Sequence, residues 1–356
     1  MSIETLLHKT DLTKDDIIQL LQSTGDDEKL LFDFSGKIKQ KNVGNTVYLR
    51  GLIELSNICE KDCYYCGIRK SNFNVHRYSI SDDEVLGAIK YAYENGYGSV
   101  AIQSGEIQSK AFTEKITRIL QNARKLTNGE LGVTLSCGEQ TEETYRQWFE
   151  AGASRYLLRI ETSKAELYSK LHPNDEIHCF ERRLEALEIL RKTSYQVGTG
   201  VMIGLPFQTI EDLADDLLFM KNFDIDMCGM GPYIEHHETP LYAFKDNLKP
   251  LKERFDLSLK MIAILRILMP DINIAATTAL QTIEQNGREQ AIQIGANVLM
   301  PNITPRKYRD DYFLYENKPV SGQSEADDLK ILEKSLAAIG HQIGFGVQGN
   351  SKHFSK

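Results

Sequence analysis

The chain has 356 residues, of which 41% are hydrophobic and 26% charged, and its formal net charge is −8. This composition is typical of a globular protein with a sizeable core, and the acidic balance argues against general binding to nucleic acid or anionic lipid. No run of 18 apolar residues occurs and residues 1–15 are charged throughout, so we expect neither a membrane-spanning helix nor a signal peptide.

Residues 1–45 form a polar segment with helical patterning, which we interpret as an N-terminal helical extension. Ile17, Ile18 and Leu20 contribute to a partial apolar face, and Asp11 and Thr13 are candidate helix caps because their side-chain oxygens can accept bonds from free backbone N–H groups.

From residue 46 onward, short β-branched or apolar runs alternate with helix-like stretches. The predicted strands are Thr46–Leu55, Ser99–Gln103, Gly132–Ser136, Arg155–Ile160, Gly198–Ile203, Asp226–Gly231, Asn273–Thr277 and Asn297–Met300. Ser81, Thr141 and Thr209 are placed to cap helices over 82–94, 142–151 and 210–223.

Eight β/α units in about 255 residues predict a (β/α)8 barrel, with an open doubly wound sheet as the alternative. We therefore expect a TIM-type α/β barrel over residues 46–315, between the extension at 1–45 and a C-terminal tail at 316–356. Within the tail, Ser321–Lys356, we predict a helix over Glu325–Ile339, and the glycine-rich end that follows has no interpretation from sequence.

The first predicted strand leads into Cys59, Cys63 and Cys66, spaced C-x3-C-x2-C, with Tyr65 before the last. Three thiolates on one loop can hold three irons of a 4Fe–4S cube and leave the fourth open to a small molecule. A structural zinc site is an alternative, but zinc usually takes four ligands, and the nearest fourth candidate, His76, lies outside a compact knuckle. Three unrelated core thiols are the other alternative.

Barrels place their chemistry at the carboxyl ends of their strands, so the polar residues there are candidate ligands. Strand two ends in Gln103, Gly105 and Glu106, where a glycine allows close approach and a carboxylate can accept bonds from an ammonium group; an ordinary turn is the alternative. Strand three ends at Ser136, which either bonds a ligand or caps the next loop.

Strand four ends in Arg159, Ile160 and Glu161, and because side chains alternate along a strand, the two charged residues share one face. A ligand carrying both a carboxylate and an ammonium group would partner this pair, and a structural ion pair is the alternative. The next helix carries Arg182 and Arg183; one of them is a candidate to bind a carboxylate, and a solvated helix face is the alternative for the other.

Later strand ends carry further candidates. Met202 lies between two glycines on an apolar strand end, which suits either a flat base or the ordinary ending of a strand. Thr277 and Thr278 offer hydroxyls to an anion. Tyr308 follows strand eight, where barrels often bind anionic groups. We interpret His236 and His237 as loop residues, one of which touches the site. Of the isolated thiols, we interpret Cys137, Cys179 and Cys228 as small core residues.

With these residues in place, the chain from about Asn42 to Tyr315 resembles the radical S-adenosylmethionine (SAM) maturases of FeFe-hydrogenase, the HydE family. The resemblance is carried by Glu54–Arg69, Leu131–Glu139, Ser154–Thr162, Val201–Asp216, Gly229–Leu241 and Asn273–Ala279. It implies that the clustered cysteines hold one 4Fe–4S cluster and that SAM is cleaved reductively to a 5′-deoxyadenosyl radical. No Cys follows Cys228, so we expect no second, C-terminal cluster.

The resemblance also implies roles for the strand-end residues. Those expected around SAM are Tyr65, Gly105, Glu106, Ser136, Glu161, Arg183 and Met202. Those expected around the substrate are Gln103, Arg159, Thr277, Thr278 and Tyr308. The implied partners are a small-molecule or iron-complex substrate, an electron donor such as ferredoxin or flavodoxin, and other hydrogenase maturation proteins in the cytoplasm, with no nucleic acid and no membrane.

One departure bears on the substrate: the maturase pattern has His where Ile160 stands, so any role of that His does not transfer. The alternative functions are a related radical SAM enzyme with an organic substrate, such as a methylornithine synthase-like mutase or a biotin synthase-like sulfur inserter, and a zinc-binding protein that is not an enzyme.

Overall fold

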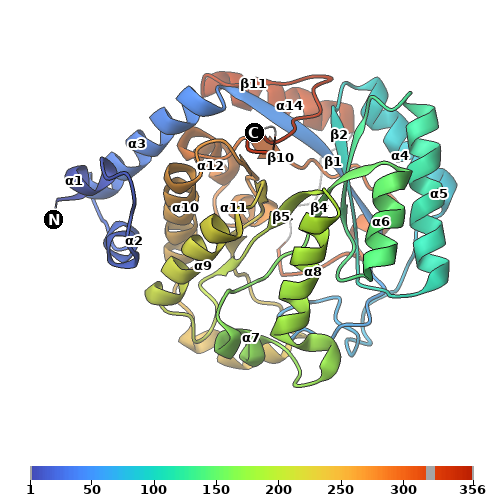
Figure 1. The fold of residues 1–356 in the computed structure, drawn as a ribbon, viewed down its shortest axis with the longest axis horizontal. Coiled ribbons are helices and arrows are strands. Elements are labelled where there is room, and N and C mark those ends of the chain that lie inside the picture. The colour runs from blue at the N-terminus through green and yellow to red at the C-terminus, as the bar shows by residue number, and fades with distance from the viewer. Residues whose placement is uncertain (1, 318–324, 355–356) are drawn as a thin grey trace.

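In the computed structural model, which describes residues 2–317 and 325–354, eight parallel strands form the centre of the molecule (Figure 1). The strands are β1 (Thr46–Ser56), β2 (Ser99–Ser104), β3 (Gly132–Ser136), β4 (Ala153–Leu157), β5 (Gln196–Thr199), β7 (Met227–Cys228), β9 (Asn273–Ile274) and β10 (Val298–Leu299). Hydrogen bonds from the Asn297 amide to Ile274 and from the Ala276 amide to Val298 join β9 to β10. Because β10 also pairs with β1, the sheet closes and the predicted barrel is confirmed.

The fourth strand begins two residues earlier than predicted, at Ala153 instead of Arg155. Ala153 and Ser154 are small and follow Gly152, so in sequence they look like a turn. The predicted end, Leu158–Ile160, follows β5 through single bonds, such as Leu158 N–H to the Gly198 carbonyl at 2.9 Å, without regular ladder pairing.

The fifth and sixth strands are each interrupted where the sequence predicts one continuous run. A Cβ on Gly200 would lie 2.1 Å from the Gly229 carbonyl oxygen, so the two backbones meet closely at this point. Beyond it a separate parallel pair forms, β6 (Met202–Ile203) with β8 (Gly231–Pro232). The interruption carries Met202 past the regular barrel toward its carboxyl end.

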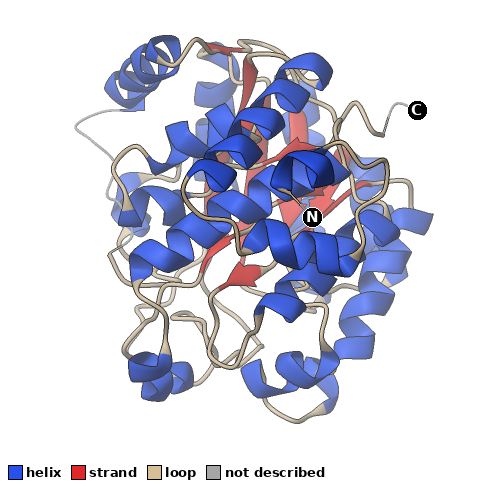
Figure 2. Ribbon diagram, turned by 90° about the vertical axis from the view of Figure 1, so that its left-hand side faces the viewer, coloured by secondary structure: helices blue, strands red, loops and turns tan. Residues whose placement is uncertain are grey.

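Helices cover the outside of the barrel, and in Figure 2 several of them cross in front of the strands. They are α4 (Asp82–Glu94), α5 (Lys110–Leu126), α6 (Glu142–Ala151), α7 (Ala165–Leu171), α8 (Phe180–Lys192), α9 (Ile210–Phe223), α10 (Leu251–Leu268), α11 (Thr278–Ile283), α12 (Gly287–Ile294), α13 (Arg306–Arg309) and α14 (Glu325–Ala338), with 3-10 turns η1 (Glu176–His178) and η2 (Pro240–Asn247). Ser81, Thr141 and Thr209 each accept a first-turn amide, so the three predicted caps are confirmed.

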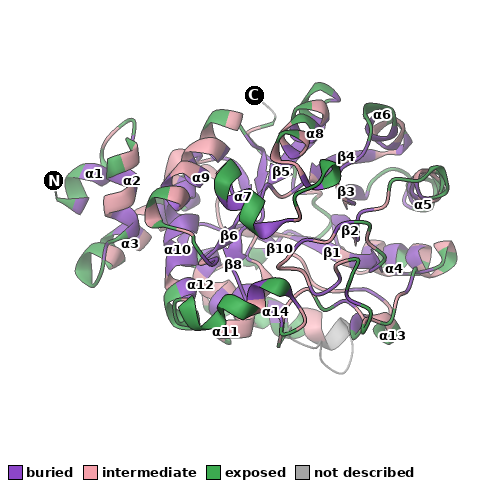
Figure 3. Cartoon of the chain, turned by 90° about the horizontal axis from the view of Figure 1, so that it is seen from below, coloured by how far each residue is buried: buried purple, intermediate pink, exposed green. Residues whose placement is uncertain are grey.

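The N-terminal extension comprises α1 (Ile3–Leu7), α2 (Lys14–Leu21) and α3 (Asp26–Asn42), which pack beside α9 and α10 (Figure 3). Thr13 caps α2 in a reciprocal pair with Asp16, as predicted. Asp11 is not a cap; its carboxylate instead pairs with Lys221 of α9 at 3.1 Å.

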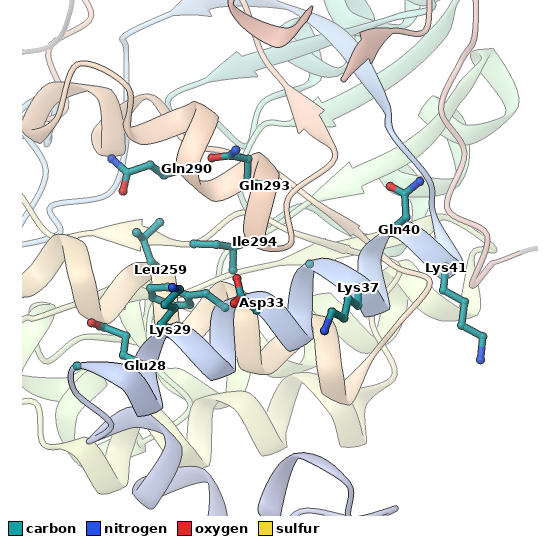
Figure 4. A pocket seen from close by; sticks show the side chains of 13 residues that line it. Glu28, Lys29, Asp33, Lys37, Gln40, Lys41, Leu259, Gln290, Gln293 and Ile294 are labelled. Carbon is teal, nitrogen blue, oxygen red and sulfur yellow. The ribbon is translucent and has the colours of Figure 1, made fainter. Parts of the chain in front are cut away.

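A groove of about 730 Å³ lies between α3 and the helices α10 and α12 (Figure 4). Its walls carry Lys29, Lys37 and Lys41 of α3 beside Gln290 and Gln293 of α12. None of the residues that line the groove is one of the cysteines or strand-end residues predicted above to form the site.

The predicted tail helix is confirmed as α14, while residues 318–324 and 355–356 of the tail lie outside the described residues. After α14, β11 (Gln342–Ile343) pairs with the start of β1. The glycine-rich segment 344–351 then crosses the amino end of the barrel, hydrogen-bonded to four side chains that point inward. These bonds join Arg50 to the Gly349 carbonyl, Arg155 to Gln348 and Asn350, Gln196 to Asn350 and Ser351, and Asn273 to Gly349.

Segment 344–351 therefore acts as a floor that closes the barrel at its amino end. Gly349 is required there, because its φ is +64° and a Cβ would lie 2.5 Å from the Tyr48 ring. Two residues beyond the floor, His353 lies between Asp224 (2.8 Å) and Asp271 (3.0 Å). In the part of the chain that the structure describes, no helix is long and apolar enough to cross a membrane.

The ion pairs of His353 should stabilise the segment next to the floor to an extent that depends on pH. Burial lowers the pKa of His353, but its bonds to Asp224 and Asp271 outweigh burial and raise the pKa above the ordinary 6.5. The contribution of the His353 ion pairs to the free energy of unfolding is thus complete below pH 6.5. It is lost as the pH rises through the raised pKa of His353 in the folded protein. We expect His353→Ala to lower the free energy of unfolding by about 0.5–1 kcal/mol near pH 6 and by less near pH 9. Urea unfolding of both proteins at the two pH values measures this, and an equal loss at both would contradict the ion pair.

Candidate active site

The three clustered cysteines lie on a long irregular loop, residues 57–80, between β1 and α4. The Cys66 amide donates to the Cys63 carbonyl at 3.2 Å, and the Glu106 amide donates to the Cys59 thiol at 3.4 Å. The loop owes its shape to Arg77, whose guanidinium donates bonds of 2.6–3.0 Å to the carbonyls of Asn57, Ile68, Arg69 and Asn72. One cation thus replaces the backbone partners that a helix or strand would supply.

The thiols fit an iron–sulfur cluster by their chemistry. Burial raises the pKa of Cys59 and Cys63, and raises that of Cys66 to about 12, so the free thiols stay protonated until a metal displaces the protons. Within residues 2–317 and 325–354 no three His, Cys, Asp or Glu side chains form a site for one metal ion. A 4Fe–4S cube takes one thiolate per iron, so its three cysteines need not converge on one point.

Gly105 allows the cysteine loop to approach the end of β2. A Cβ there would lie 2.2 Å from the Ile58 carbonyl oxygen and 2.9 Å from the Cys59 Cβ. The glycine proposed for ligand approach therefore also has a structural role, because it brings Cys59 against the strand ends.

Four charged side chains meet beside Cys59 in a buried network. Lys61 Nζ lies 3.2 Å from Glu106 and 3.0 Å from Glu139, and Arg183 Nε donates to Glu139 at 2.5 Å. Arg183 Nη2 is 4.0 Å from Glu106, and all four side chains are at most 8% exposed. Arg182, about one-third exposed, adds a contact to Glu139 at 3.1 Å. The structure thus brings Glu106 and Arg183 together, as the sequence leads us to expect.

The two carboxylates of this network differ in electrostatics. Burial and the nearby Glu139 charge raise the pKa of Glu106. Burial also acts to raise the pKa of Glu139, but the charges of Arg183 and Lys61 outweigh it and hold that pKa below its usual range. Glu139 is therefore the firmly ionised centre of the network.

At the end of the fourth strand, Arg159 Nη2 lies 3.0 Å from Glu161, so the two side chains share a face as predicted. Glu161 has φ +67°, a left-handed conformation that is uncommon outside glycine and typical of functional positions. Ile160 points away and is fully buried in the main hydrophobic core. The residue that departs from the family pattern thus packs in the core and does not face this ion pair.

The turn after Glu161 is fastened by Asp216 of α9. Its Oδ1 accepts bonds from the Ser163 amide (2.6 Å) and hydroxyl (2.7 Å), with the Thr162 hydroxyl at 3.4 Å. Burial raises the pKa of Asp216 to about 7. Asp216 thereby holds the strained backbone at Glu161 in place.

A second apolar cluster borders the cysteine loop. Met202 belongs to it, and Tyr65 packs against it. The Tyr65 hydroxyl lies 3.3 Å from Nε2 of the buried His172, whose Nδ1 bonds the Tyr168 carbonyl at 2.8 Å. Because a carbonyl can only accept, Nδ1 carries the proton and Nε2 accepts from Tyr65. Two residues expected around SAM thus line one apolar wall.

The remaining candidates are distributed around the rim. Gln103 and Ser136 are directly paired in the β2–β3 register, so they share a face of the sheet. Thr277 lies at the start of α11 with its hydroxyl 3.5 Å from the Met230 carbonyl, and Thr278 is the first residue of that helix. His236 packs against Gly67 of the cysteine loop, whereas His237 pairs with Glu316.

Tyr308 does not join these residues. Its hydroxyl donates to Glu84 of the outer helix α4 at 3.0 Å, and its ring stacks on Tyr78. The substrate role predicted for Tyr308 therefore finds no support, because a strand-end position does not fix the direction of a side chain that follows a loop.

Among the isolated thiols, Cys137 and Cys228 are buried core residues, as predicted. Cys179 is not: it is half-buried and caps α8, with its sulfur accepting the Arg182 amide at 3.4 Å.

Sequence reasoning missed Lys61, Arg77, Glu139, His172 and Asp216. Lys61 and Arg77 lie in or near the cysteine motif, which was a usable signal, but charged loop residues are usually solvated. Glu139 and Asp216 lie inside stretches that resemble the maturases, and no local pattern gives either a role.

Residues 53–220 match the Radical SAM superfamily. The chain is 42% identical over 324 residues to the FeFe-hydrogenase maturase subunit HydE of Thermotoga maritima, covering 91% of this chain and 89% of that protein. It is 28% identical over 299 residues to 3-methylornithine synthase of Methanosarcina acetivorans, covering 83% and 81% of the two chains.

Among solved structures, methylornithine synthase superposes with a TM-score of 0.81 at 24% identity, over 97% of this chain and 98% of that one. The FeFe-hydrogenase maturase HydG superposes with a TM-score of 0.78 at 20% identity, over 96% and 74%. At these identities the likeness establishes the barrel fold alone.

Substitution of Gly138 tests whether the Glu106 side chain is held in the buried network. Its φ is +73° and a Cβ would lie 2.3 Å from the Glu106 side chain, whereas Gly129, at φ +74°, has only an Arg124 atom at 3.9 Å. We expect Gly129→Ala to cost roughly 1–2 kcal/mol of backbone strain, and Gly138→Ala to cost about 1–3 kcal/mol more because Glu106 must move. Urea unfolding of the two variants gives the difference, and equal losses would show that Glu106 is not held there.

Proposed function

The chain belongs to the HydE family of FeFe-hydrogenase maturases, within the radical SAM superfamily, and from that premise we propose that it acts in assembly of the hydrogenase diiron site. The observation that carries this proposal is the 42% identity over nine-tenths of the chain, together with three cysteines gathered at the carboxyl end of β1.

Cys59, Cys63 and Cys66 would hold the 4Fe–4S cluster. When bound, the cluster would supply the electron for reductive cleavage of SAM to a 5′-deoxyadenosyl radical. We propose a single cluster, because the sequence has no cysteine after Cys228. The remaining chemistry of the site belongs to the protein, which must bind, orient and shield the reactants.

The charged residues of the site divide into cations suited to the carboxylate of an amino acid and carboxylates suited to its ammonium group. Arg183 and Arg159 can bind a carboxylate, while Glu106 and Glu161 can accept bonds from an ammonium group. Met202 and Tyr65 give an apolar wall suited to a flat base. We assign these residues, with Ser136, to SAM, and Gln103, Thr277 and Thr278 to the substrate, whereas Tyr308 is left out because it faces α4.

The finer parts of the function rest on the family. We propose an iron complex as substrate, a ferredoxin or flavodoxin as electron donor, other maturation proteins as partners, and a cytoplasmic location, which suits free thiols. A related enzyme with an organic substrate is the second candidate, favoured by the 28% identity to 3-methylornithine synthase over 83% of this chain.

Complementation tests the maturase role. In a strain that lacks its own HydE, we expect this protein to activate an FeFe-hydrogenase apoprotein, measured as hydrogen evolution. Cys63→Ala should abolish activation because one iron loses its thiolate. As a control, Cys228→Ala removes a buried thiol that contacts Met220 of α9, and it should retain activity. SAM cleavage without activation of the hydrogenase would instead favour an organic substrate.

Glu161→Gln tests the carboxylate at the fourth strand. The change removes a charge-assisted bond while keeping the side-chain shape, so SAM affinity should fall by roughly 1.5–3 kcal/mol. Equilibrium binding of SAM to the reconstituted protein measures the loss. Glu94→Gln, on the exposed face of α4, should bind SAM as the wild type does. Unchanged affinity in Glu161→Gln would make Glu161 a purely structural partner of Arg159.

A further inference from the structure

Lys61 lies inside the cysteine motif, between Cys59 and Cys63, yet its side chain is only 5% exposed. Lysine is rarely buried unless its charge is paired. Here the ammonium group meets three acceptors from three different elements: Glu106 after β2 (3.2 Å), Glu139 after β3 (3.0 Å) and the Ile177 carbonyl of η1. The cysteine loop is thus tied through one side chain to two strand ends and to the turn before α8.

The partner of Lys61, Glu106, also reaches the first cysteine through its backbone. The Glu106 amide donates to the Cys59 thiol at 3.4 Å, and the Glu60 amide donates to the Glu106 carbonyl at 2.8 Å. The end of β2 is therefore joined to the cysteine loop twice, once through the Lys61 and Glu106 side chains and once around Cys59.

Both carboxylate oxygens of Glu139 are engaged by cations of the protein. One of its oxygens accepts Arg183 Nε at 2.5 Å, and the other faces Lys61 at 3.0 Å and Arg182 at 3.1 Å. Its side chain is 2% exposed, so it acts on other protein groups only. It fixes the Nε edge of Arg183, which leaves Nη2 of that arginine 4.0 Å from Glu106, beyond hydrogen-bond distance.

The charges depend on each other. The buried part of the network holds two carboxylates and two cations. If Lys61 lost its charge, Glu106 would remain buried with Arg183 as its nearest cation, and an unpaired buried carboxylate costs several kcal/mol. Arg183 would then be drawn from Glu139 toward Glu106. Lys61 thus allows Arg183 and Glu106 to stand 4.0 Å apart. Arg183 meanwhile bonds Glu139 and the Arg159 carbonyl, and Glu106 bonds Lys61 and the Glu139 amide.

We propose that Lys61 is a positioning residue for SAM: through Glu139 and Glu106 it holds Arg183 and Glu106 apart at the spacing that a ligand with a carboxylate and an ammonium group requires. The inference rests on the proposed function, since it takes SAM as that ligand. It adds that the loop holding the cluster also sets the geometry of the groups that bind SAM.

The test is Lys61→Met, which removes the charge and keeps an unbranched apolar stem. Lys39→Met is the matched control, because Lys39 is also buried, at 1% exposure, but bonds the Ile292 carbonyl and His341 far from the cysteine loop. Both variants and the wild type are reconstituted without oxygen. Iron and sulfide per chain are counted, and the change in the electron paramagnetic resonance spectrum of the reduced cluster is followed as SAM is added.

We expect Lys61→Met to hold the wild-type amount of iron, since the three cysteines are intact. The SAM concentration that gives half of the spectral change should rise about 30-fold, as expected when one partner of a buried charge pair is removed. Lys39→Met should keep the wild-type concentration. A Lys61→Met protein with normal iron and an unchanged half-saturating concentration would overturn the proposal.

If Lys61→Met fails to fold or to hold iron, Glu139→Gln tests the same positioning role of the network. It keeps Lys61 paired with Glu106 but releases Arg183, so it should also raise the half-saturating SAM concentration, and an unchanged value would overturn the proposal. A wild-type spectrum that does not respond to SAM would instead refute the proposed function, which separates the two failures.

Discussion

The burial of two carboxylates, Glu106 and Glu139, at the open end of the barrel is the constraint on which the rest of the site depends. Neither can stay ionised there without a cation, and the two cations come from distant parts of the chain, Lys61 from the cysteine loop and Arg183 from α8. Satisfying these charges fixes the cysteine loop against the ends of β2 and β3. The position of the thiols is therefore a consequence of electrostatics as much as of backbone geometry.

The elements that sequence predicted well are those whose signal is local. Ser81, Thr141 and Thr209 cap helices because each hydroxyl lies next to the amides that it satisfies. The barrel follows from alternating strands and helices, and the three cysteines from their spacing. The boundary of β4 was missed because Ala153 and Ser154 carry little strand preference, and the start of the strand is set by the pairing of Ala153 with Val133 of β3.

What sequence could not supply is long-range pairing of single residues. Lys61 looks like an ordinary loop charge until Glu139, 78 residues later, is brought beside it. Tyr308 illustrates the same limit, because Glu84, which accepts a bond from its hydroxyl, lies 224 residues earlier. The glycine-rich end had no interpretation because its partners, Arg50 and Arg155, are separated from it by 299 and 193 residues.

That last separation bears on how the protein acquires its structure. The floor of the barrel is built from residues 344–351, whose partners lie on β1, β4, β5 and β9, so none of these bonds can form until nearly the whole chain is available. Contacts of such sequence separation form late, because the entropy of closing the intervening chain is lost before they are gained. Until this segment is in place, Arg50 and Arg155 lack the carbonyl acceptors that it supplies, so the polar interior of the barrel is completed only when the end of the chain has docked.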